Sequence, residues 1–251
     1  MPDCRLRHPQ RQKESGALSS LTMKALEFMY RRGYEVRRHP AVRRARMLAA
    51  HEVDLVIDVG AAVGGYGSQL RKFGYAGDIV SFEPLDTAYA ELSAVTGSDA
   101  RWSTRQAALG SAAGEAQINI ASNSDSSSLL PMGSAHTDAE PSVGIIGSQT
   151  VRVERLDDVI DEFARPESRI FLKIDAQGFE REVLAGAAKT LERCRGLQLE
   201  LSFISLYEGG MLVNEAISLA YDAGFSMVGV EQGWAAGTGQ MLQADGVFFR
   251  L

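Results

Sequence analysis

The sequence has few cysteines and histidines and no long apolar run, and these absences narrow the class of protein. Its two cysteines, Cys4 and Cys194, lie in unrelated contexts without metal-ligand spacing, so we expect reduced thiols and no metal site built on cysteine. No run approaches the ~18 apolar residues that a membrane-spanning helix needs. No apolar stretch follows the basic N-terminus to form a secretory signal. Together these absences predict a cytoplasmic protein.

The composition is that of a globular domain with an unevenly charged appendage. The chain has 251 residues, of which 45% are apolar, enough to bury a sizeable core. Residues 1–50 carry 12 basic and 4 acidic side chains, a net charge of +8, whereas residues 51–251 carry −14. We therefore expect a basic extension over 1–50, with a disordered tip before two helices, and one domain over 51–251. The extension could contact anionic lipid, nucleic acid or an acidic face of its own fold, or be solvated.

From residue 54 onwards short apolar runs alternate with helical patterns. Such alternation implies right-handed crossovers and a mostly parallel sheet covered on both faces. The predicted strands are 54–60, 78–84, 102–109, 115–120, 149–153, 169–175, 197–203, 225–231 and 243–250. The predicted helices are 18–31, 43–50, 66–73, 87–95, 156–163, 179–193 and 213–223.

Two departures from a purely parallel sheet are expected. Segments 115–120 and 149–153 should form an antiparallel excursion, and the final strand should pair antiparallel because only a glycine-containing loop precedes it. Residues 121–148 are rich in serine and glycine, and their length indicates a functional loop or lid. The sequence therefore predicts a doubly wound, Rossmann-like α/β fold with N-terminal helices.

The first strand leads into a turn of small residues before the next helix. Gly60, Ala62 and Gly64 lie in this turn between Asp58 and Tyr66. A nucleotide-type cofactor requires close backbone approach at such a turn, and glycine tolerates its dihedral angles. The middle glycine of the dinucleotide fingerprint is replaced by Ala62, and no Gly-Lys-Ser/Thr follows to make a P-loop. Packing alone also accounts for small-residue turns.

An acidic residue ends each of two further strands. Glu83, followed by Pro84, lies 25 residues after Asp58, where a carboxylate can bind both ribose hydroxyls of an adenosine. The absence of a basic neighbour disfavours a 2′-phosphate. Asp175 ends a strand and precedes Gln177 and a glycine. These carboxylates should converge on one crevice at the carboxyl ends of the strands, although each could instead cap a helix.

At these residues the chain resembles the FkbM family of S-adenosylmethionine-dependent O-methyltransferases. The resemblance covers roughly residues 54–251. It rests on VIDVGAAVGGYG, SFEP, AALG, SSSLL, RLDD, LKIDAQGFEREVLAGA and ELSFISLYEGG. The family usually has Asn at the position of Ala62 and often Gln at that of Gly65. The resemblance implies a class I methyltransferase sheet.

The resemblance also implies roles for individual residues. Asp58, Gly60 and Gly64 would shape the turn that binds S-adenosylmethionine, and Glu83 would hold the ribose. Ala108 and Leu109 would flank the adenine. Asp175 would lie near the methionyl group or the reaction centre. The full set of expected cofactor-binding residues is Asp58, Gly60, Ala62, Gly64, Tyr66, Glu83, Pro84, Ala108, Leu109 and Asp175.

An alcohol is a poor nucleophile at neutral pH, so a base or a metal ion would assist methyl transfer. Asp175, His136 and Glu208 are the candidate catalytic bases. His136 lies in the 121–148 segment and could close over substrate, or it could simply be solvated. We expect no metal ion, with a divalent cation held by Asp175 and Glu200 as the alternative.

The resemblance implies a sugar hydroxyl of a glycolipid or secondary metabolite as acceptor. We expect no nucleic-acid partner, and peripheral membrane contact through the basic extension is a further prediction. Two rival hypotheses are an NAD-dependent oxidoreductase and a non-catalytic binding module on the same fold. The missing middle glycine and the antiparallel final strand argue against the first. The retained acidic residues and glycines argue against the second.

Overall fold

A computed structural model describes residues 20–36 and 39–251, so the expected disordered tip lies outside the described residues. The chain divides into two compact units, Met1–His39 and Pro40–Leu251. The first contains α1 (Ser20–Arg31) and the second begins with α2 (Pro40–Ala50). Leu48 of α2 is buried in a cluster that includes Val56 and Phe171 of the sheet. The second expected helix is therefore part of the body.

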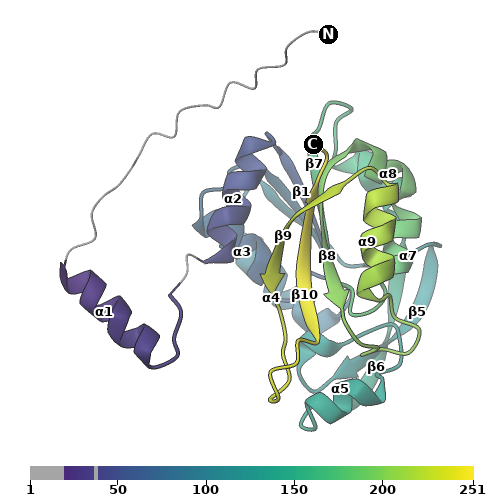
Figure 1. The fold of residues 1–251 in the computed structure, drawn as a ribbon. Coiled ribbons are helices and arrows are strands. Elements are labelled where there is room, and N and C mark those ends of the chain that lie inside the picture. The colour runs from purple at the N-terminus through teal and green to yellow at the C-terminus, as the bar shows by residue number, and fades with distance from the viewer. Residues whose placement is uncertain (1–19, 37–38) are drawn as a thin grey trace, which may run out of the picture. The chain divides into compact units, whose positions relative to one another are not determined.

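A seven-stranded sheet with the order β3-β2-β1-β7-β8-β10-β9 forms the centre of the body (Figure 1). Its strands, in the order of the chain, are β1 (Leu55–Val59), β2 (Asp78–Phe82), β3 (Trp102–Arg105), β7 (Ile170–Ile174), β8 (Cys194–Ser202), β9 (Ser226–Gln232) and β10 (Gln243–Phe249). Only β10 runs against its neighbours, pairing antiparallel with β8 and β9. This confirms the predicted doubly wound α/β fold with an antiparallel final strand.

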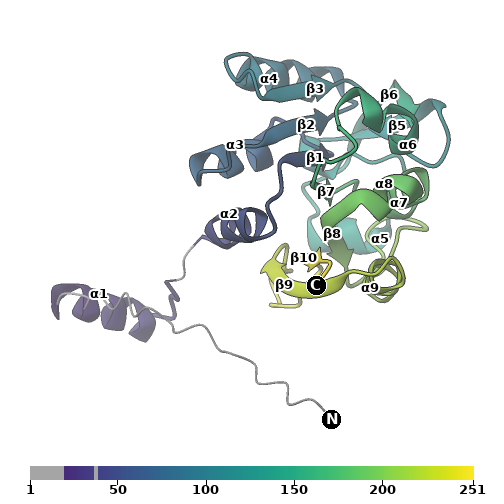
Figure 2. The same ribbon diagram turned by 90° about the horizontal axis from the view of Figure 1, so that it is seen from above.

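Helices cover both faces of the sheet, so its central strands are apolar along almost their whole length. Every residue of β1 and β7 is buried. Figure 2 shows α2 and α3 (Gly65–Lys72) on one face, with α7 (Glu180–Gly186), α8 (Ala188–Arg193) and α9 (Val213–Asp222) on the other. Helix α4 (Asp86–Thr96) precedes β3 in the chain.

The segments that were expected to pair antiparallel outside the main sheet belong to a second, three-stranded sheet. It has the order β4-β6-β5, with β4 at Ala108–Leu109, β5 at Gly114–Ala121 and β6 at Ile145–Glu154. The antiparallel pairing of β5 with β6 confirms the prediction. The prediction of one strand over 102–109 was wrong, because the chain turns after Arg105, where the Ala107 N–H bonds to its carbonyl. β3 stays in the main sheet and β4 joins β6 in the second.

Two other elements differ from expectation. The helix expected over 179–193 is interrupted at Ala187, where α7 ends and α8 begins. Gly186 packs against the backbone of Gly110, and a Cβ at position 186 would fall 2.0 Å from the Gly110 carbonyl oxygen. The segment 121–148 contains the turn η1 (Ser124–Ser126) and the helix α5 (Ser134–Ala139). Between β6 and β7 lie α6 (Leu156–Val159) and η2 (Ile160–Glu162).

Among the described residues, no helix combines the length and apolarity needed to cross a bilayer.

Candidate functional site

Three carboxylates lie at the carboxyl ends of three adjacent parallel strands. Asp58 is the fourth residue of β1, Glu83 directly follows β2, and Asp175 directly follows β7. Since β2 and β7 flank β1 on either side, the sheet brings these side chains to one edge. Ligands of open α/β sheets bind at this edge.

The turn after β1 is built for close contact between strand ends. Gly60 has φ +71°, and a Cβ there would lie 1.9 Å from the Asp175 carbonyl oxygen. Gly64 has φ +86°, and its Cβ would lie 2.9 Å from Leu92. Ala62 also has a left-handed backbone, with φ +46°, although it is not a glycine. The protein's own packing therefore explains the glycines at 60 and 64, and their role in cofactor approach stays a prediction.

Glu83 fixes the shape of this turn. Its side chain is buried, with one oxygen accepting the Ala62 N–H and the other the Leu85 N–H, both at 2.9 Å. Burial raises the pKa of Glu83, and the two backbone donors oppose that rise. A carboxylate oxygen accepts more than one hydrogen bond, so each oxygen retains capacity for a ligand hydroxyl.

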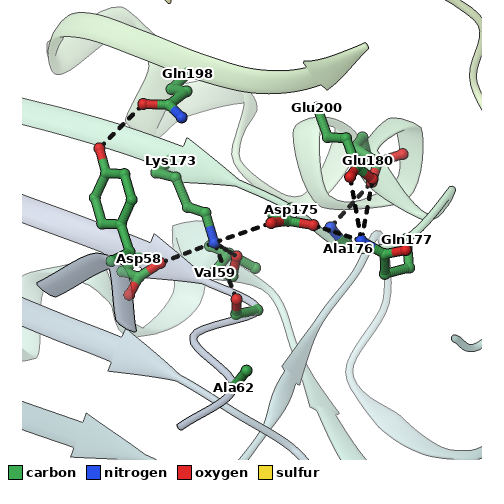
Figure 3. A network of polar contacts seen from close by, with 12 residues as sticks. Asp58, Val59, Ala62, Lys173, Asp175, Ala176, Gln177, Glu180, Gln198 and Glu200 are labelled. Carbon is green, nitrogen blue, oxygen red and sulfur yellow. Dashed lines mark hydrogen bonds and ion pairs between the residues drawn. The ribbon is translucent and has the colours of Figure 1, made fainter. Parts of the chain in front are cut away.

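Lys173, which the sequence analysis did not single out, joins the ends of β1 and β7 (Figure 3). Its Nζ lies 3.1 Å from Asp58 Oδ1 and 3.5 Å from Asp175 Oδ2. It also donates to the carbonyls of Val59, at 3.3 Å, and Gly60, at 3.0 Å. Burial opposes its charge, but Asp58 and Asp175 outweigh burial and raise the pKa of the Lys173 ammonium. The signal was visible as one lysine within an apolar strand, because lysine is almost never buried unpaired.

Asp58 is shared between Lys173 and a second chain of polar contacts. Ser81 of β2 donates to Asp58 Oδ2 at 3.2 Å, and the Trp102 indole N–H donates to the Ser81 hydroxyl at 3.0 Å. Asp58 is fully buried. It is thus a structural centre of the strand ends, and a ligand contact is still a prediction.

Gln177 organises the other side of Asp175. Its Nε2 donates to Asp175 Oδ1 at 2.8 Å and lies 3.2 Å from both oxygens of Glu200 (Figure 3). Its backbone is left-handed, with φ +52°, a conformation that costs energy in a non-glycine residue and is often found at functional sites. The amide nitrogen therefore contacts both carboxylates that the metal alternative would use. The described residues hold no group of three or more potential metal ligands suited to an ion.

Further carboxyl groups lie around Asp175, namely the buried Glu180 and the half-buried Glu200 and Asp245. Glu180 accepts the N–H groups of Ala176, at 3.0 Å, and Gly178, at 3.1 Å. Burial raises the pKa of Glu180 to about 7. Burial, followed by the charges of Asp175 and Glu180, raises the pKa of Glu200 well above its usual value. Burial likewise raises the pKa of Asp245. Sequence reasoning paired Glu200 with Asp175 in the metal alternative but missed Glu180 and Asp245, because the members come from three separate segments.

Tyr66 extends the polar layer towards α2. Its hydroxyl donates to Gln198 Oε1 at 3.1 Å, and the Arg44 guanidinium lies 4.4 Å above its ring. Arg44, buried, pairs with Glu231 of β9. Burial raises the pKa of Tyr66, so its hydroxyl stays protonated at neutral pH. The expected cofactor contact of Tyr66 remains a prediction.

His136 is buried in α5, with 2% of its surface exposed. Its ring packs against Tyr207, with centroids 5.7 Å apart, and Trp234, at 5.0 Å. Burial lowers the pKa of His136, and its Nδ1 has no hydrogen-bond partner among the described residues. Tyr207 places its hydroxyl 2.7 Å from Gln177 Oε1. The side chain of Tyr207 therefore lies between His136 and Gln177. Because His136 is buried, the alternative of a solvated histidine was wrong.

The segment around His136 is anchored to the strand ends. The Ser128 hydroxyl donates to the Gln177 carbonyl at 2.7 Å. Met132 forms a bridge with Tyr207, and Asn119 with Ser128. The 121–148 segment is thus held in contact with the residues around Asp175.

The remaining expected site residues make other contacts. Glu208 is exposed, and its N–H bonds to the Pro131 carbonyl. Ala108 and Leu109 are buried in β4 and pair with Val153 and Glu154 of β6. The Pro84 carbonyl accepts a bond from Gln149 at 3.4 Å. Their ligand-binding roles stay predictions.

The mostly parallel strand order, the antiparallel final strand and the carboxylates at the strand ends are those of a Rossmann-like fold with a ligand site at that edge. The family model of the methyltransferase FkbM domain matches residues 58–227. The chain belongs to the FkbM methyltransferase family, and methyl transfer is its class of function.

Solved structures that are similar to the chain share little of its sequence. A methyltransferase candidate from Thermobifida fusca YX has a TM-score of 0.50 at 9% identity, covering 84% of this chain and 78% of that one. An O-methyltransferase candidate from Klebsiella pneumoniae has a TM-score of 0.47 at 13% identity, with 91% and 89% covered. Fibrillarin from Aeropyrum pernix, in complex with natively bound S-adenosyl-L-methionine, has a TM-score of 0.45 at 11% identity, with 78% and 66% covered. No curated protein matches the chain in sequence.

Proposed function

We propose that this FkbM-family methyltransferase uses S-adenosylmethionine to methylate a hydroxyl oxygen, on a sugar of a glycolipid or secondary metabolite. The observation that carries the proposal is the placement of Asp58, Glu83 and Asp175 at the ends of three adjacent strands. Family membership sets the oxidoreductase alternative aside. A non-catalytic module remains the alternative that the experiment below excludes.

The residues at the strand ends fit the proposed cofactor. Glu83 follows β2, next to the turn of β1, and each of its oxygens accepts one backbone N–H, which leaves capacity for two ribose hydroxyls. When bound, S-adenosylmethionine supplies a methyl group activated by the positive charge of its sulfonium. Asp58 and Lys173 would then hold the turn in place from below, through the ion pair and the carbonyls of Val59 and Gly60.

Asp175 is the base that the geometry favours. Its side chain is 32% exposed, whereas Asp58 is fully buried, so of these two only Asp175 offers an oxygen to a substrate. Lys173 and Gln177 hold one carboxylate oxygen each, which fixes the direction in which the carboxylate can accept a proton from an alcohol. Positioning of this kind provides much of the rate of an in-line displacement.

His136 and Glu208 are the weaker candidates for the base. Burial lowers the pKa of His136, but its ring is enclosed by Tyr207 and Trp234, and Tyr207 lies between it and Gln177. Glu208 is exposed, and no hydrogen bond or ion pair of the described residues ties its side chain to Asp175. We assign His136 a packing role and leave the proton transfer to Asp175.

Calorimetry with S-adenosylmethionine and with S-adenosylhomocysteine tests the cofactor. The variant Glu83→Gln keeps the shape of the side chain and removes its charge, so it should weaken binding by about 1–3 kcal/mol. The exposed Glu91→Gln of α4 is the matched control and should bind like the wild type. Tight NADH binding without a response to S-adenosylmethionine would exclude the proposal.

The acceptor is identified by mass spectrometry of cell extracts. Deletion of the gene should produce a metabolite lighter by one methylene group, and purified protein with S-adenosylmethionine should convert it to the heavier form. Methylation of a nitrogen atom would contradict the hydroxyl acceptor, and methylation of RNA would contradict the glycolipid or secondary metabolite, while both would keep the cofactor. Cofactor binding without any turnover would favour the non-catalytic module.

A further inference from the structure

The segment that contains α1 exposes an unusual concentration of large apolar side chains. In the described chain, six exposed side chains of this kind fall within residues 23–36. They are Met23, Phe28, Met29, Tyr30, Tyr34 and Val36. Tyr30 is 77% exposed. Single exposed apolar residues are normal on protein surfaces, but a contiguous group indicates an interaction surface.

Helix α1 separates its charged from its apolar residues. Lys24, Glu27 and Arg31 are three and four residues apart, so they form one narrow stripe. Arg31 pairs with Glu27 at 2.7 Å along this stripe. Most of the remaining circumference is apolar, including Phe28 and Met29. A helix that associates with another helix usually presents a narrow apolar seam, whereas α1 presents a wide apolar arc.

The charge of the surrounding chain complements an anionic surface. Residues 1–39 contain nine Lys and Arg against four Asp and Glu, a net charge of +5, whereas residues 40–251 carry −11. The Arg32 guanidinium lies 4.3 Å above the ring of Phe28. A long basic side chain can thus cover an apolar ring while keeping its charge at a polar boundary.

We propose that α1 is a membrane-surface helix that docks on anionic lipid bilayers. Helices that lie in the plane of a bilayer interface present an apolar face with aromatic residues opposite a charged face that includes Lys or Arg, and α1 has Phe28 and Tyr30 on its apolar arc and Lys24 and Arg31 on its charged stripe. The aromatic rings of Tyr30 and Tyr34 suit this position, since each has an apolar body and a polar tip. The docking does not depend on the methylation reaction and brings the enzyme to lipid surfaces.

Sedimentation of the full chain with lipid vesicles tests the docking. Vesicles of phosphatidylcholine with phosphatidylglycerol should carry the protein down, and phosphatidylcholine alone should bind it at least about tenfold more weakly. Binding should fall when salt rises from about 0.1 M to about 1 M, because the Debye length shortens from about 10 Å to about 3 Å. The double variant Phe28→Ser/Tyr30→Ser should lose at least about tenfold in partitioning.

Matched variants in the body distinguish docking through α1 from nonspecific adsorption to vesicles. Ile146→Ser removes an apolar side chain that is 71% exposed on β6 and should bind like the wild type. Lys24→Gln/Arg32→Gln should bind at least about tenfold more weakly, whereas Lys189→Gln/Arg152→Gln should not. Equal unfolding midpoints would show that all variants are folded.

Three results would overturn the proposal. The first is that the full chain does not sediment with anionic vesicles at low salt. The second is equal binding to neutral and anionic vesicles. The third is oligomerisation of the wild type, seen by light scattering, that Phe28→Ser/Tyr30→Ser abolishes without any vesicle binding; α1 would then dock on a second copy of the chain.

Discussion

Lys173 and Asp58 form a buried ion pair between neighbouring strands, with 3.1 Å between Nζ and Oδ1 and side chains that are 6% and 0% exposed. The two residues are also register partners in the parallel pairing of β7 with β1. Charges removed from water in this way are tolerated only when each has its partner and further hydrogen bonds. Here Lys173 donates to two carbonyls and Asp58 accepts from Ser81.

Removal of one partner should therefore destabilise the fold much more than removal of both. Lys173→Met leaves Asp58 buried without its cation, and we expect a loss of about 3–5 kcal/mol in the free energy of unfolding. The double variant Lys173→Met/Asp58→Asn should recover at least half of that loss. Urea denaturation measures both, with the exposed Lys189→Met as control. A single variant as stable as the wild type would show that the pair is not coupled.

Asp175→Asn should separate catalysis from folding. The asparagine oxygen can still accept the Gln177 amide, so stability should change by about 1 kcal/mol. Turnover should fall by ~10²-fold or more, because the base is lost. The affinity for S-adenosylhomocysteine and the unfolding midpoint are measured alongside. Unchanged turnover would show that Asp175 only organises the strand end.

A chelator tests the metal alternative without any substitution. The Gln177 amide lies between Asp175 and Glu200 and donates to both. We therefore expect wild-type turnover to persist after chelation. Loss of turnover that a divalent cation restores would reopen the alternative in which Asp175 and Glu200 hold an ion.

Gly60→Ala should be severely destabilising because of the Asp175 backbone. The new Cβ would fall 1.9 Å from the Asp175 carbonyl oxygen at a residue with φ +71°. Gly74 is the matched control, since it has φ +93° but nothing within 4 Å of its Cβ position. Gly74→Ala should cost about 1–2 kcal/mol from the left-handed backbone alone, and Gly60→Ala several kcal/mol more. If Gly60→Ala and Gly74→Ala lose equal stability in thermal unfolding, the fold does not require the close contact between Gly60 and the Asp175 backbone.

The sheet was predictable from the sequence because its strands bury both faces. Runs such as 54–60 and 169–175 are nearly continuous in apolar residues, and β1 and β7 lie within them. The convergence of the acidic strand ends was predictable for another reason, because the carboxyl ends of parallel strands meet at one edge of the sheet. The break between β3 and β4 was not, because the two strands join different sheets only through distant partners in β2 and β6.

The inner arrangement of the site depends on contacts that no local pattern encodes. The left-handed backbone of Gln177 is stabilised by Ser128 and Tyr207, which are 49 and 30 residues away. The burial of His136 depends in the same way on Tyr207 and Trp234. Lys173 was different, because a lysine inside an apolar strand already indicated a buried partner.

The carboxyl group of Glu180 should make stability fall as pH rises. Its folded pKa is raised to about 7, above an ordinary value of 4.5, by burial. Between these two values the unfolded chain has lost the proton that the folded chain retains, so the unfolded state gains relative to the folded one. The contribution of Glu180 to stability is therefore fully present below about pH 4.5 and is lost as pH rises towards about 7.

Glu180→Gln should remove that pH dependence. The glutamine oxygen can still accept the N–H groups of Ala176 and Gly178, and it carries no charge at any pH. We expect the variant to gain on the wild type by about 1–3 kcal/mol between pH 5 and pH 8. Denaturant titrations at several pH values measure the difference, and Glu115→Gln, an exposed residue of β5, controls for the loss of one acidic group. If the wild type and Glu180→Gln show parallel pH profiles, Glu180 is ionised in the folded protein throughout this range, and the two backbone donors outweigh the effect of its burial.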